Sequence, residues 1–373
     1  RPGRQGPEVR AGAAVAWRVG AAWLCAAALA AAAQDDFLVP PRNLVLDGVP
    51  PIPAAIAARV APYTEFKTGG MLDWHPQRRE ILVRQRLANT NQLHRVEDPG
   101  QAPVPITDLA DAVAGGRYEP KSAAYVLLTG GEGGNEVFRI RRYDPATKEA
   151  VPVSPEGVRA GVPQWSHKGE RIVFTTVPVD RNNASKEVET TVHLADPREP
   201  SRSRVLAVLP GGGWYGFRFS PNDRQLVYQE YKSAEESHLW LLDVATGKSR
   251  RLTKPGKAGP VSYRDPHFAP DGKSVFAISD RDSEFRRLAV IDVASGREQA
   301  LAANIRADVE DFALSAAARQ LAFITNDAGE HTLRFLDTAT RKELPRPALV
   351  PGVISGLRWR ADGSEIAFTH ASS

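Results

Sequence analysis

The chain has 373 residues, of which 42% are hydrophobic and 25% charged, and it contains a single cysteine. This composition is that of a globular protein, and it excludes a wholly disordered, collagenous or disulfide-based chain. The formal net charge of +4 comes from 48 basic and 44 acidic residues that are interleaved along the sequence, so we expect no nucleic-acid partner.

The first part of the sequence has the three features of a secretory signal peptide. Arg10 and Arg18 precede a short apolar run, residues 19–33, which ends in small residues before Gln34. The run is too short and too rich in alanine for a transmembrane helix, which needs roughly 20 strongly apolar residues. We therefore expect residues 1–33 to be a signal peptide, and the protein to be periplasmic or secreted without membrane attachment after cleavage. An alanine-rich helix inside a cytosolic protein is the alternative.

Residues 34–66 form a segment of their own before the repeats begin. Ile52, Ile56 and Val60 recur at the spacing of one helix face. The pattern predicts a short helix over residues 53–63, packed on the outside of the domain that follows.

From residue 67 onward the sequence repeats one pattern. An anchor residue, aromatic or apolar, is followed by a turn rich in Ser, Pro, Asp and Gly and then by an apolar run typical of a β-strand. A second element lies between successive anchors, with an apolar strand, an acidic residue and a tight turn, as in residues 239–248. The seven anchors recur every 44 to 54 positions and are Trp74, Tyr118, Trp165, Phe219, Phe268, Leu314 and Trp359.

Each period predicts four short strands joined by turns that suit positive φ. Four antiparallel strands in about 40–50 residues are typical of a β-propeller blade. We expect residues 67–373 to form an all-β, seven-bladed propeller of four-stranded blades, in which the anchors fill the space between neighbouring blades. The seventh blade is expected to be incomplete, cut after its second strand, and to leave an edge strand that lowers stability.

These repeats resemble the propellers of TolB-like proteins and of the prolyl oligopeptidase family of serine peptidases. The stretches that favour the second likeness are residues 50–53 with Tyr63, 72–76, 89–96 and 279–288. The resemblance covers residues 38–373. It implies a bacterial parent with an N-terminal propeller and a C-terminal α/β-hydrolase domain that bears Ser, Asp and His. In that family the peptidase hydrolyses short peptides and the propeller restricts access to the catalytic triad.

The catalytic motif of such a domain is missing from this sequence. An α/β-hydrolase nucleophile lies in G-x-S-x-G, and no serine of this chain has glycine at both flanking positions. We therefore expect no catalytic residue in this chain and no peptidase activity from it alone. Its expected partners are the C-terminal α/β-hydrolase domain of the same parent chain and a peptide substrate. The rival interpretation is a non-catalytic periplasmic propeller that binds a protein partner, as TolB-like modules do.

The sequence also gives no sign of a metal or a cofactor. The eight histidines form no H-x-x-x-H pattern, and none pairs with a carboxylate at metal-ligand spacing. We expect neither a metal nor a cofactor, and a propeller enzyme with a central metal is disfavoured for the same reason.

Recognition is expected on the propeller face that carries the longer and more variable loops. In a four-stranded blade the first and third turns lie on one face, and the second turn and the connection to the next blade lie on the other. The residues that we select there as candidate contacts with substrate or partner domain are Trp214, Tyr215, Asp280, Arg281, Asp282 and Glu284. A solvated loop is the alternative for the four charged residues.

Overall fold

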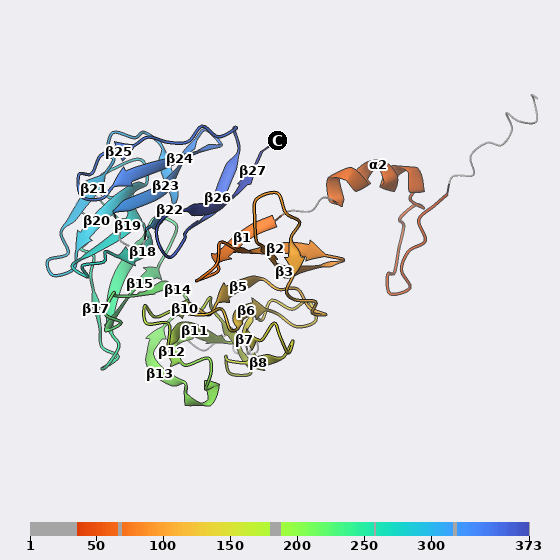
Figure 1. Cartoon of the computed structure of the whole chain (residues 1–373), viewed down its shortest axis with the longest axis horizontal. Helices are drawn as coiled ribbons and strands as arrows, with labels where there is room; N and C mark the ends of the chain where they lie inside the picture. Colours follow the sequence, from red (N-terminus) through yellow and green to blue (C-terminus); the bar gives the residue numbers. More distant parts are fainter. Residues whose placement is uncertain (1–35, 66–68, 180–187, 257–258, 316–318, 373) are drawn as a thin grey trace, which may run out of the picture. The chain divides into compact units, whose positions relative to one another are not determined.

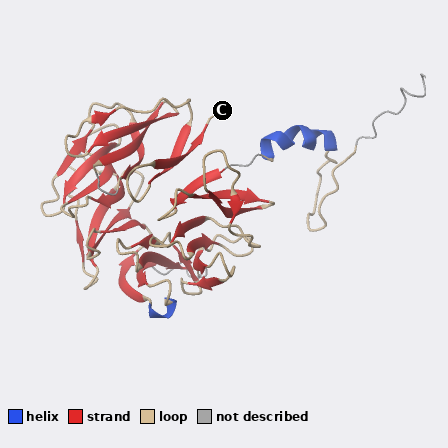
Figure 2. Cartoon of the chain, viewed as in Figure 1, coloured by secondary structure: helices blue, strands red, loops and turns tan. Residues whose placement is uncertain are grey.

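The computed structural model describes residues 36–65, 69–179, 188–256, 259–315 and 319–372. The chain divides into two units, Arg1–Lys67 and Thr68–Ser373. Across the described residues the regular structure is one α-helix, one short 3₁₀ helix and a series of β-strands (Figure 2). The predicted signal peptide, residues 1–33, lies outside the described residues.

The first unit contains the predicted helix. Helix α2 (Ala54–Thr64) begins one residue later than predicted and ends one residue later. Pro53 directly precedes the helix. The backbone N–H that proline lacks is not needed there, because the first N–H groups of a helix have no intrahelical partner. Phe37 forms an isolated β-bridge with Pro53, which ties the preceding chain to the start of the helix. The expected packing of this helix on the outside of the propeller stays a prediction.

The second unit is a β-propeller whose antiparallel sheets follow one another along the chain (Figure 1). In the described residues, six sheets have four strands in chain order, and the third of them gains a short extra strand, β9. This confirms the predicted all-β propeller with four-stranded blades.

The first two sheets contain β1 (Gly69–Trp74), β2 (Ile81–Leu87), β3 (Thr90–Val96) and β4 (Val104–Pro105), then β5 (Gly115–Tyr118), β6 (Val126–Gly130), β7 (Arg139–Tyr143) and β8 (Ala150–Pro152). The third and fourth contain β9 (Val158–Ala160), β10 (Gln164–Trp165), β11 (Ile172–Pro178), β12 (Glu189–Ala195) and β13 (Arg204–Pro210), then β14 (Trp214–Phe219), β15 (Gln225–Tyr231), β16 (Ser237–Asp243) and β17 (Ser249–Arg251). The fifth and sixth contain β18 (Tyr263–Phe268), β19 (Ser274–Ser279), β20 (Arg287–Asp292) and β21 (Glu298–Leu301), then β22 (Asp308–Leu314), β23 (Gln320–Asp327), β24 (Glu330–Asp337) and β25 (Glu343–Leu344). The 3₁₀ helix η1 (Pro200–Arg202) lies between β12 and β13.

A final sheet of two strands, β26 (Val353–Trp359) and β27 (Ile366–Ala371), follows the sixth. Strand β26 contacts β22 of the sixth sheet and also β1 of the first. The chain therefore returns to its starting sheet and closes a ring, as Figure 1 shows for the labels β26, β27 and β1.

All seven predicted anchors occupy one structural position. Each is the last residue of the innermost strand of its sheet: β1, β5, β10, β14, β18, β22 and β26 end in Trp74, Tyr118, Trp165, Phe219, Phe268, Leu314 and Trp359. Their side chains pack between neighbouring sheets, as predicted. Phe219 of the fourth sheet, for example, belongs to the same buried cluster as Val173 and Leu194 of the third.

The core consists of such clusters, each shared by two adjacent sheets. The cluster between the fifth and sixth sheets includes Phe276 and Ile278 on one side and Leu321 and Phe323 on the other, all less than 9% exposed. Each large apolar side chain buried in this way stabilises the fold by roughly 1.5–3 kcal/mol. Because every sheet shares a cluster with its neighbour, the ring is stabilised mainly by contacts between sheets.

The propeller has two different ends. The turn end has the short connections after the first and third strands of each sheet. A typical turn there places the Asp243 carboxylate 2.8 Å from the main-chain N–H of Thr246, and Gly247 follows with φ of 71°, a value that suits glycine. The loop end has the connections after the second strand and between sheets. Their lengths vary: two residues join β2 to β3 and β23 to β24, whereas eight join β6 to β7.

Candidate functional site

The inner strands of the propeller surround its centre. The candidate site contains residues of these strands that directly precede the anchors. Side chains alternate along a strand, so the residue before each anchor projects from the opposite face of its sheet. These predecessors, here called the channel belt, are Asp73, Arg117, Gln164, Arg218, His267, Ala313 and Arg358.

Part of the belt lines a cavity of about 270 Å³ at the turn end. Its lining includes Asp73, Arg117, Gln164 and Arg358, together with the anchors beside them. One acidic and two basic side chains from three different sheets therefore share one small space.

Asp73 is the most perturbed member of this group. Its carboxylate accepts hydrogen bonds from the main-chain N–H groups of Trp74 at 3.1 Å and Tyr118 at 3.0 Å. Burial raises the pKa of Asp73 to about 6, although the nearby Arg358 charge and these N–H groups act in the opposite direction. Burial also lowers the pKa of Arg358 from its ordinary value, and the Asp73 charge opposes that change. The cavity thus holds a carboxyl group that titrates near neutral pH.

A second charged group lies on the opposite side of the ring, on β14, β18 and β22. Asp265 lies 3.4 Å from the Arg218 guanidinium and 3.2 Å from the ring nitrogen of His267. Its backbone has a φ of 47° within a β-bulge, which turns the carboxylate toward both partners. Burial alone would raise the pKa of Asp265, but His267 and Arg218 outweigh it and hold the pKa at about 2. Burial, followed by the Asp265 charge, raises the pKa of nearby Asp311.

A larger cavity, of about 620 Å³, lies at the loop end among the inner strands of the second, third and fourth sheets. Its lining includes two of the predicted contact residues, Trp214 and Tyr215, and the basic side chains of Arg117 and Arg159. We refer to it as the loop-end pocket. Because Arg117 also contributes to the turn-end cavity, the two spaces meet at the same belt residue.

Trp214 and Tyr215 lie in the first two residues of β14, although the sequence placed them in the linker before that strand. Trp214 is 6% exposed, and its indole N–H donates to the main-chain oxygen of Pro210 at 2.8 Å. Tyr215 is 55% exposed. Trp214 therefore forms a wall of the pocket, whereas Tyr215 is available at its rim.

The other four predicted contacts lie in the loop between β19 and β20, and the lining of the loop-end pocket includes none of them. Arg281 binds the Glu298 carboxylate at 2.8 Å and the Tyr263 hydroxyl at 2.7 Å, and Asp280 accepts from the N–H of Ser262 at 2.8 Å. These contacts anchor the loop to the fifth sheet. The remaining two, Asp282 and Glu284, are exposed.

The sequence did not point to the belt charges or to Arg159. The sequence does contain a pattern for the belt charges. Each directly precedes an anchor, and because side chains alternate along a strand it lies on the opposite face of the sheet from that anchor. Arg159 had none, because β9 carries no anchor and its place at the pocket follows only from the pairing of β9 with β11.

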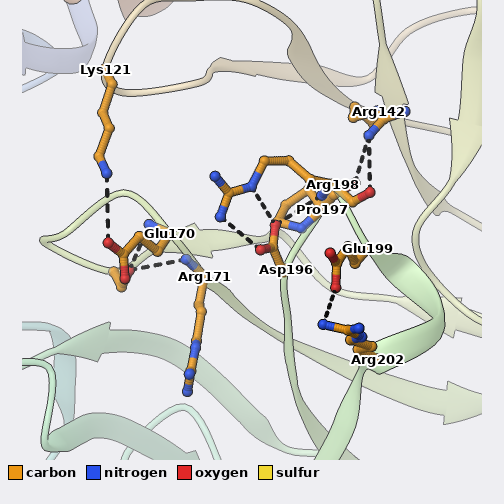
Figure 3. A network of polar contacts seen from close by, with 10 residues as sticks. Lys121, Arg142, Glu170, Arg171, Asp196, Pro197, Arg198, Glu199 and Arg202 are labelled. Atoms are coloured by element: carbon orange, nitrogen blue, oxygen red, sulfur yellow. Dashed lines mark hydrogen bonds and ion pairs between the residues drawn. The ribbon is translucent and has the colours of Figure 1, made fainter.

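A network of polar contacts on the surface has a structural role (Figure 3). It lies at the turn end of the second and third sheets. Arg198 binds Asp196 through two nitrogens, at 2.9 and 2.7 Å, and Arg142 donates to the main-chain oxygen of Pro197 at 3.3 Å. Lys121 pairs with Glu170 at 3.7 Å. Through these contacts the network joins neighbouring sheets.

Two negative findings concern only the residues that the structure describes. Within them no group of three His, Cys, Asp or Glu side chains is placed to hold a metal ion. The described helices also include none that is long and apolar enough to cross a membrane.

Comparison with known proteins identifies the fold. No family model matches this sequence, and no curated protein matches it significantly. The fold is similar to that of an oligogalacturonate lyase in complex with manganese, with a TM-score of 0.63, 12% identity, and coverage of 80% of this chain and 86% of that one.

It is also similar to a prolyl endopeptidase, with a TM-score of 0.64, 13% identity, and coverage of 82% of this chain and 46% of that one. The chain therefore spans less than half of the length of that enzyme. TolB from Acinetobacter baumannii gives a TM-score of 0.48 at 14% identity, with 78% of this chain and 67% of that one covered. At such identities the likenesses to the lyase and to the prolyl endopeptidase show a shared propeller fold.

Proposed function

We propose that this chain is the substrate-gating and docking propeller of an exported serine peptidase of the prolyl oligopeptidase family, which hydrolyses short peptides. The observation that carries the proposal is the charged channel belt. Asp73, Arg117 and Arg358 share one cavity, so a peptide at the channel meets both an acidic and a basic side chain. An extended peptide with one charged end of each sign matches such a site, and a folded protein does not fit a space of about 270 Å³.

The likeness to a prolyl endopeptidase supports the same proposal. The chain covers 46% of that enzyme, and the part covered is a propeller. On this proposal the α/β-hydrolase domain of the same parent chain is the docking partner, since the sequence itself carries no G-x-S-x-G elbow. Export to the periplasm or the medium is part of the proposal and rests on the apolar run of residues 19–33.

We further propose that β26 and β27 are the inner half of a seventh blade. Their sheet contacts both the first and the sixth sheets. Trp359 ends β26 at the anchor position, and its indole N–H donates to the main-chain oxygen of Ala313, at 3.0 Å, in the preceding sheet. Two outer strands added to β27 would give this sheet the same four-stranded form as the other six.

Peptide hydrolysis by two forms of the protein tests the proposed function. The chain as given is expected to cleave no short chromogenic peptide. The product of the complete reading frame is expected to cleave such peptides, with inhibition by a serine-directed reagent. Hydrolysis by the chain alone, blocked by that reagent, would refute the assignment of a purely gating and docking role.

The second candidate is a propeller that binds a protein partner without catalysis. It is favoured by two exposed tyrosines at the loop end of the fourth sheet, Tyr215 and Tyr231, which are 55% and 46% exposed. Their strands are paired, and the N–H of Tyr231 donates to the oxygen of Gly213 at 2.7 Å. Exposed tyrosine is enriched where proteins bind one another. Capture of a specific partner by the chain, lost in a Tyr215→Ala/Tyr231→Ala variant, would support this candidate.

A further inference from the structure

The loop-end pocket has the size and the apolar surface of a small-molecule site. Its volume of about 620 Å³ falls within the roughly 300–1,000 Å³ of typical ligand pockets. Three of its lining residues are exposed large hydrophobic residues: Val162 at 63%, Tyr215 at 55% and Phe138 at 39%. Exposed apolar side chains that converge on one concave space are typical of a binding site.

The charges of this pocket have one sign. The lining includes Arg117 and Arg159 and no acidic side chain. Arg117 donates to the main-chain oxygen of Leu72, which orients its guanidinium without neutralising it. Arg159 is exposed and, within the described part of the chain, its side chain forms no hydrogen bond or ion pair. A cation without a partner beside an apolar wall leaves its charge available to an anionic ligand.

Threonine hydroxyls add to the polar lining, and two of them share one arrangement. Thr129 and Thr175 both line the pocket, each opposite a glycine of an inner segment. A Cβ at Gly115 would lie 2.9 Å from the Thr129 hydroxyl oxygen, and a Cβ at Gly161 would lie 2.5 Å from that of Thr175. Any larger residue at these two positions would therefore displace the hydroxyls. The second and third sheets thus repeat the same arrangement of a glycine and a threonine at the pocket.

We propose that the loop-end pocket binds a small carboxylate with an aromatic or branched apolar body. Arg159, with Arg117 behind it, binds the carboxylate, because planar guanidinium groups match its two oxygens. The threonine hydroxyls donate to the same group. Phe138, Val162 and Tyr215 enclose the apolar body. The free carboxyl end of a short peptide and a small organic acid share this chemistry. The inference rests on the pocket alone and holds whether or not the chain belongs to a peptidase.

Binding of four matched probes to the purified chain tests the proposal. Two are 3-phenylpropionate and its amide, and two are acetyl-Ala-Phe and its C-terminal amide. Calorimetry or quenching of aromatic fluorescence gives each dissociation constant. We expect at least one acid to bind with a constant of about 0.1–1 mM, and its amide to bind about 10-fold more weakly, because one charge-assisted contact is lost. The acid that binds more tightly identifies the source as organic acid or peptide end.

Three variants assign the binding to the pocket. Arg159→Gln is expected to remove the roughly 10-fold preference for acid over amide. Arg306→Gln, which changes an exposed arginine of the sixth-sheet connection, should keep that preference. Phe138→Ala should weaken acid and amide alike. The proposal is overturned if neither acid binds saturably, if acid and amide bind equally, or if the Arg159→Gln protein, folded by circular dichroism, retains the preference. None of these outcomes depends on peptide hydrolysis, so a failure here is distinguishable from failure of the proposed function.

Discussion

The indole N–H of Trp74 donates to the main-chain oxygen of Arg358 across 2.9 Å, joining two residues that are 284 positions apart in the sequence. The same bond recurs one sheet earlier, where Trp359 donates to the oxygen of Ala313 at 3.0 Å. In both cases the donor is the tryptophan anchor of one sheet. The acceptor is the residue directly before the anchor of the preceding sheet. The two-stranded β26–β27 sheet is therefore the neighbour of the first sheet in the ring.

The closing contact includes two further polar interactions. Besides the Trp74 bond, the N–H of Met71 donates to the Thr369 hydroxyl at 2.7 Å, and Arg79 pairs with Glu365 at 2.8 Å. These polar contacts join the start and the end of the propeller, whereas each cluster described between other sheets is apolar. Removing one of them is expected to weaken ring closure measurably.

Replacing Trp74 by Phe tests this closure. The change removes the donor to Arg358 and leaves that carbonyl oxygen without it, at a cost of about 1 kcal/mol. Trp165→Phe is the matched control, because Trp165 is the anchor of the third sheet and its buried indole nitrogen has no hydrogen-bond partner among the described residues. Urea unfolding should show Trp74→Phe to be less stable than Trp165→Phe by about this amount. Equal free energies of unfolding would mean that the closing bond contributes nothing.

Asp73 gives stability a pH dependence with a definite sign. Its pKa is about 6 in the folded chain, against 3.8 for an unperturbed aspartate, so the folded state binds the proton more tightly. Stability should therefore fall as the pH rises from about 4 to about 6. In Asp73→Asn this contribution is absent. The difference in unfolding free energy, wild type minus variant, should decrease across that interval; a constant difference would contradict the raised pKa.

Asp265 should behave in the opposite way. Its folded pKa of about 2 lies below the ordinary value, so the contacts of its carboxylate with His267 and Arg218 stabilise the protein above about pH 4 and are lost as the pH falls toward 2. Asp265→Asn should therefore destabilise the chain at pH 7 and progressively less at pH 3. Asp311→Asn is the comparison, since burial raises the pKa of Asp311. Chemical unfolding of both variants from pH 3 to 7 should give trends of opposite sign, and parallel trends would argue against this electrostatic arrangement.

Gly161 and Thr175 form a pair that a double-mutant cycle can test. A Cβ at position 161 would lie 2.5 Å from the Thr175 hydroxyl oxygen, whereas the next nearest atoms are 3.7 Å away or more. Gly161→Ala should cost about 1–3 kcal/mol through this overlap. In a Thr175→Ala background the same change should cost much less. Gly212→Ala, where the nearest atom is 3.6 Å from the added Cβ, serves as the control within the same pocket. An unchanged cost in the Thr175→Ala background would show that the overlap is not with the hydroxyl.

Much of the fold could be predicted because the repeat is local. An anchor, a turn and an apolar run lie within about ten consecutive residues, so Phe268 and its turn identify the end of one strand and the start of the next. The helix at Ala54–Thr64 was predictable for the same reason, since its apolar spacing lies in one short segment.

The candidate site was less predictable because the residues that contact one another there are distant in sequence. Arg281 looked like a free loop charge, yet it binds Glu298 and the hydroxyl of Tyr263 on neighbouring strands. The residues around Asp73 gave no sign of its charged neighbour Arg358, which only ring closure brings beside it. Tyr215 lies at the loop-end pocket, and its role as a contact residue stays a prediction. Arg159, whose side chain has no ion pair among the described residues, carried no pattern of its own.

The central claim, that this propeller gates and docks a peptidase domain, is tested most directly by the coding sequence that follows Ser373 together with the activity of its product. We expect the reading frame to complete the outer strands beside β27 and to continue through a G-x-S-x-G elbow followed by Asp and His. The purified product should hydrolyse short peptides but not folded proteins, and a serine-directed inhibitor should abolish that activity. A stop codon within one hairpin of Ser373, and a product that cleaves no peptide, would contradict the claim and favour the protein-binding propeller.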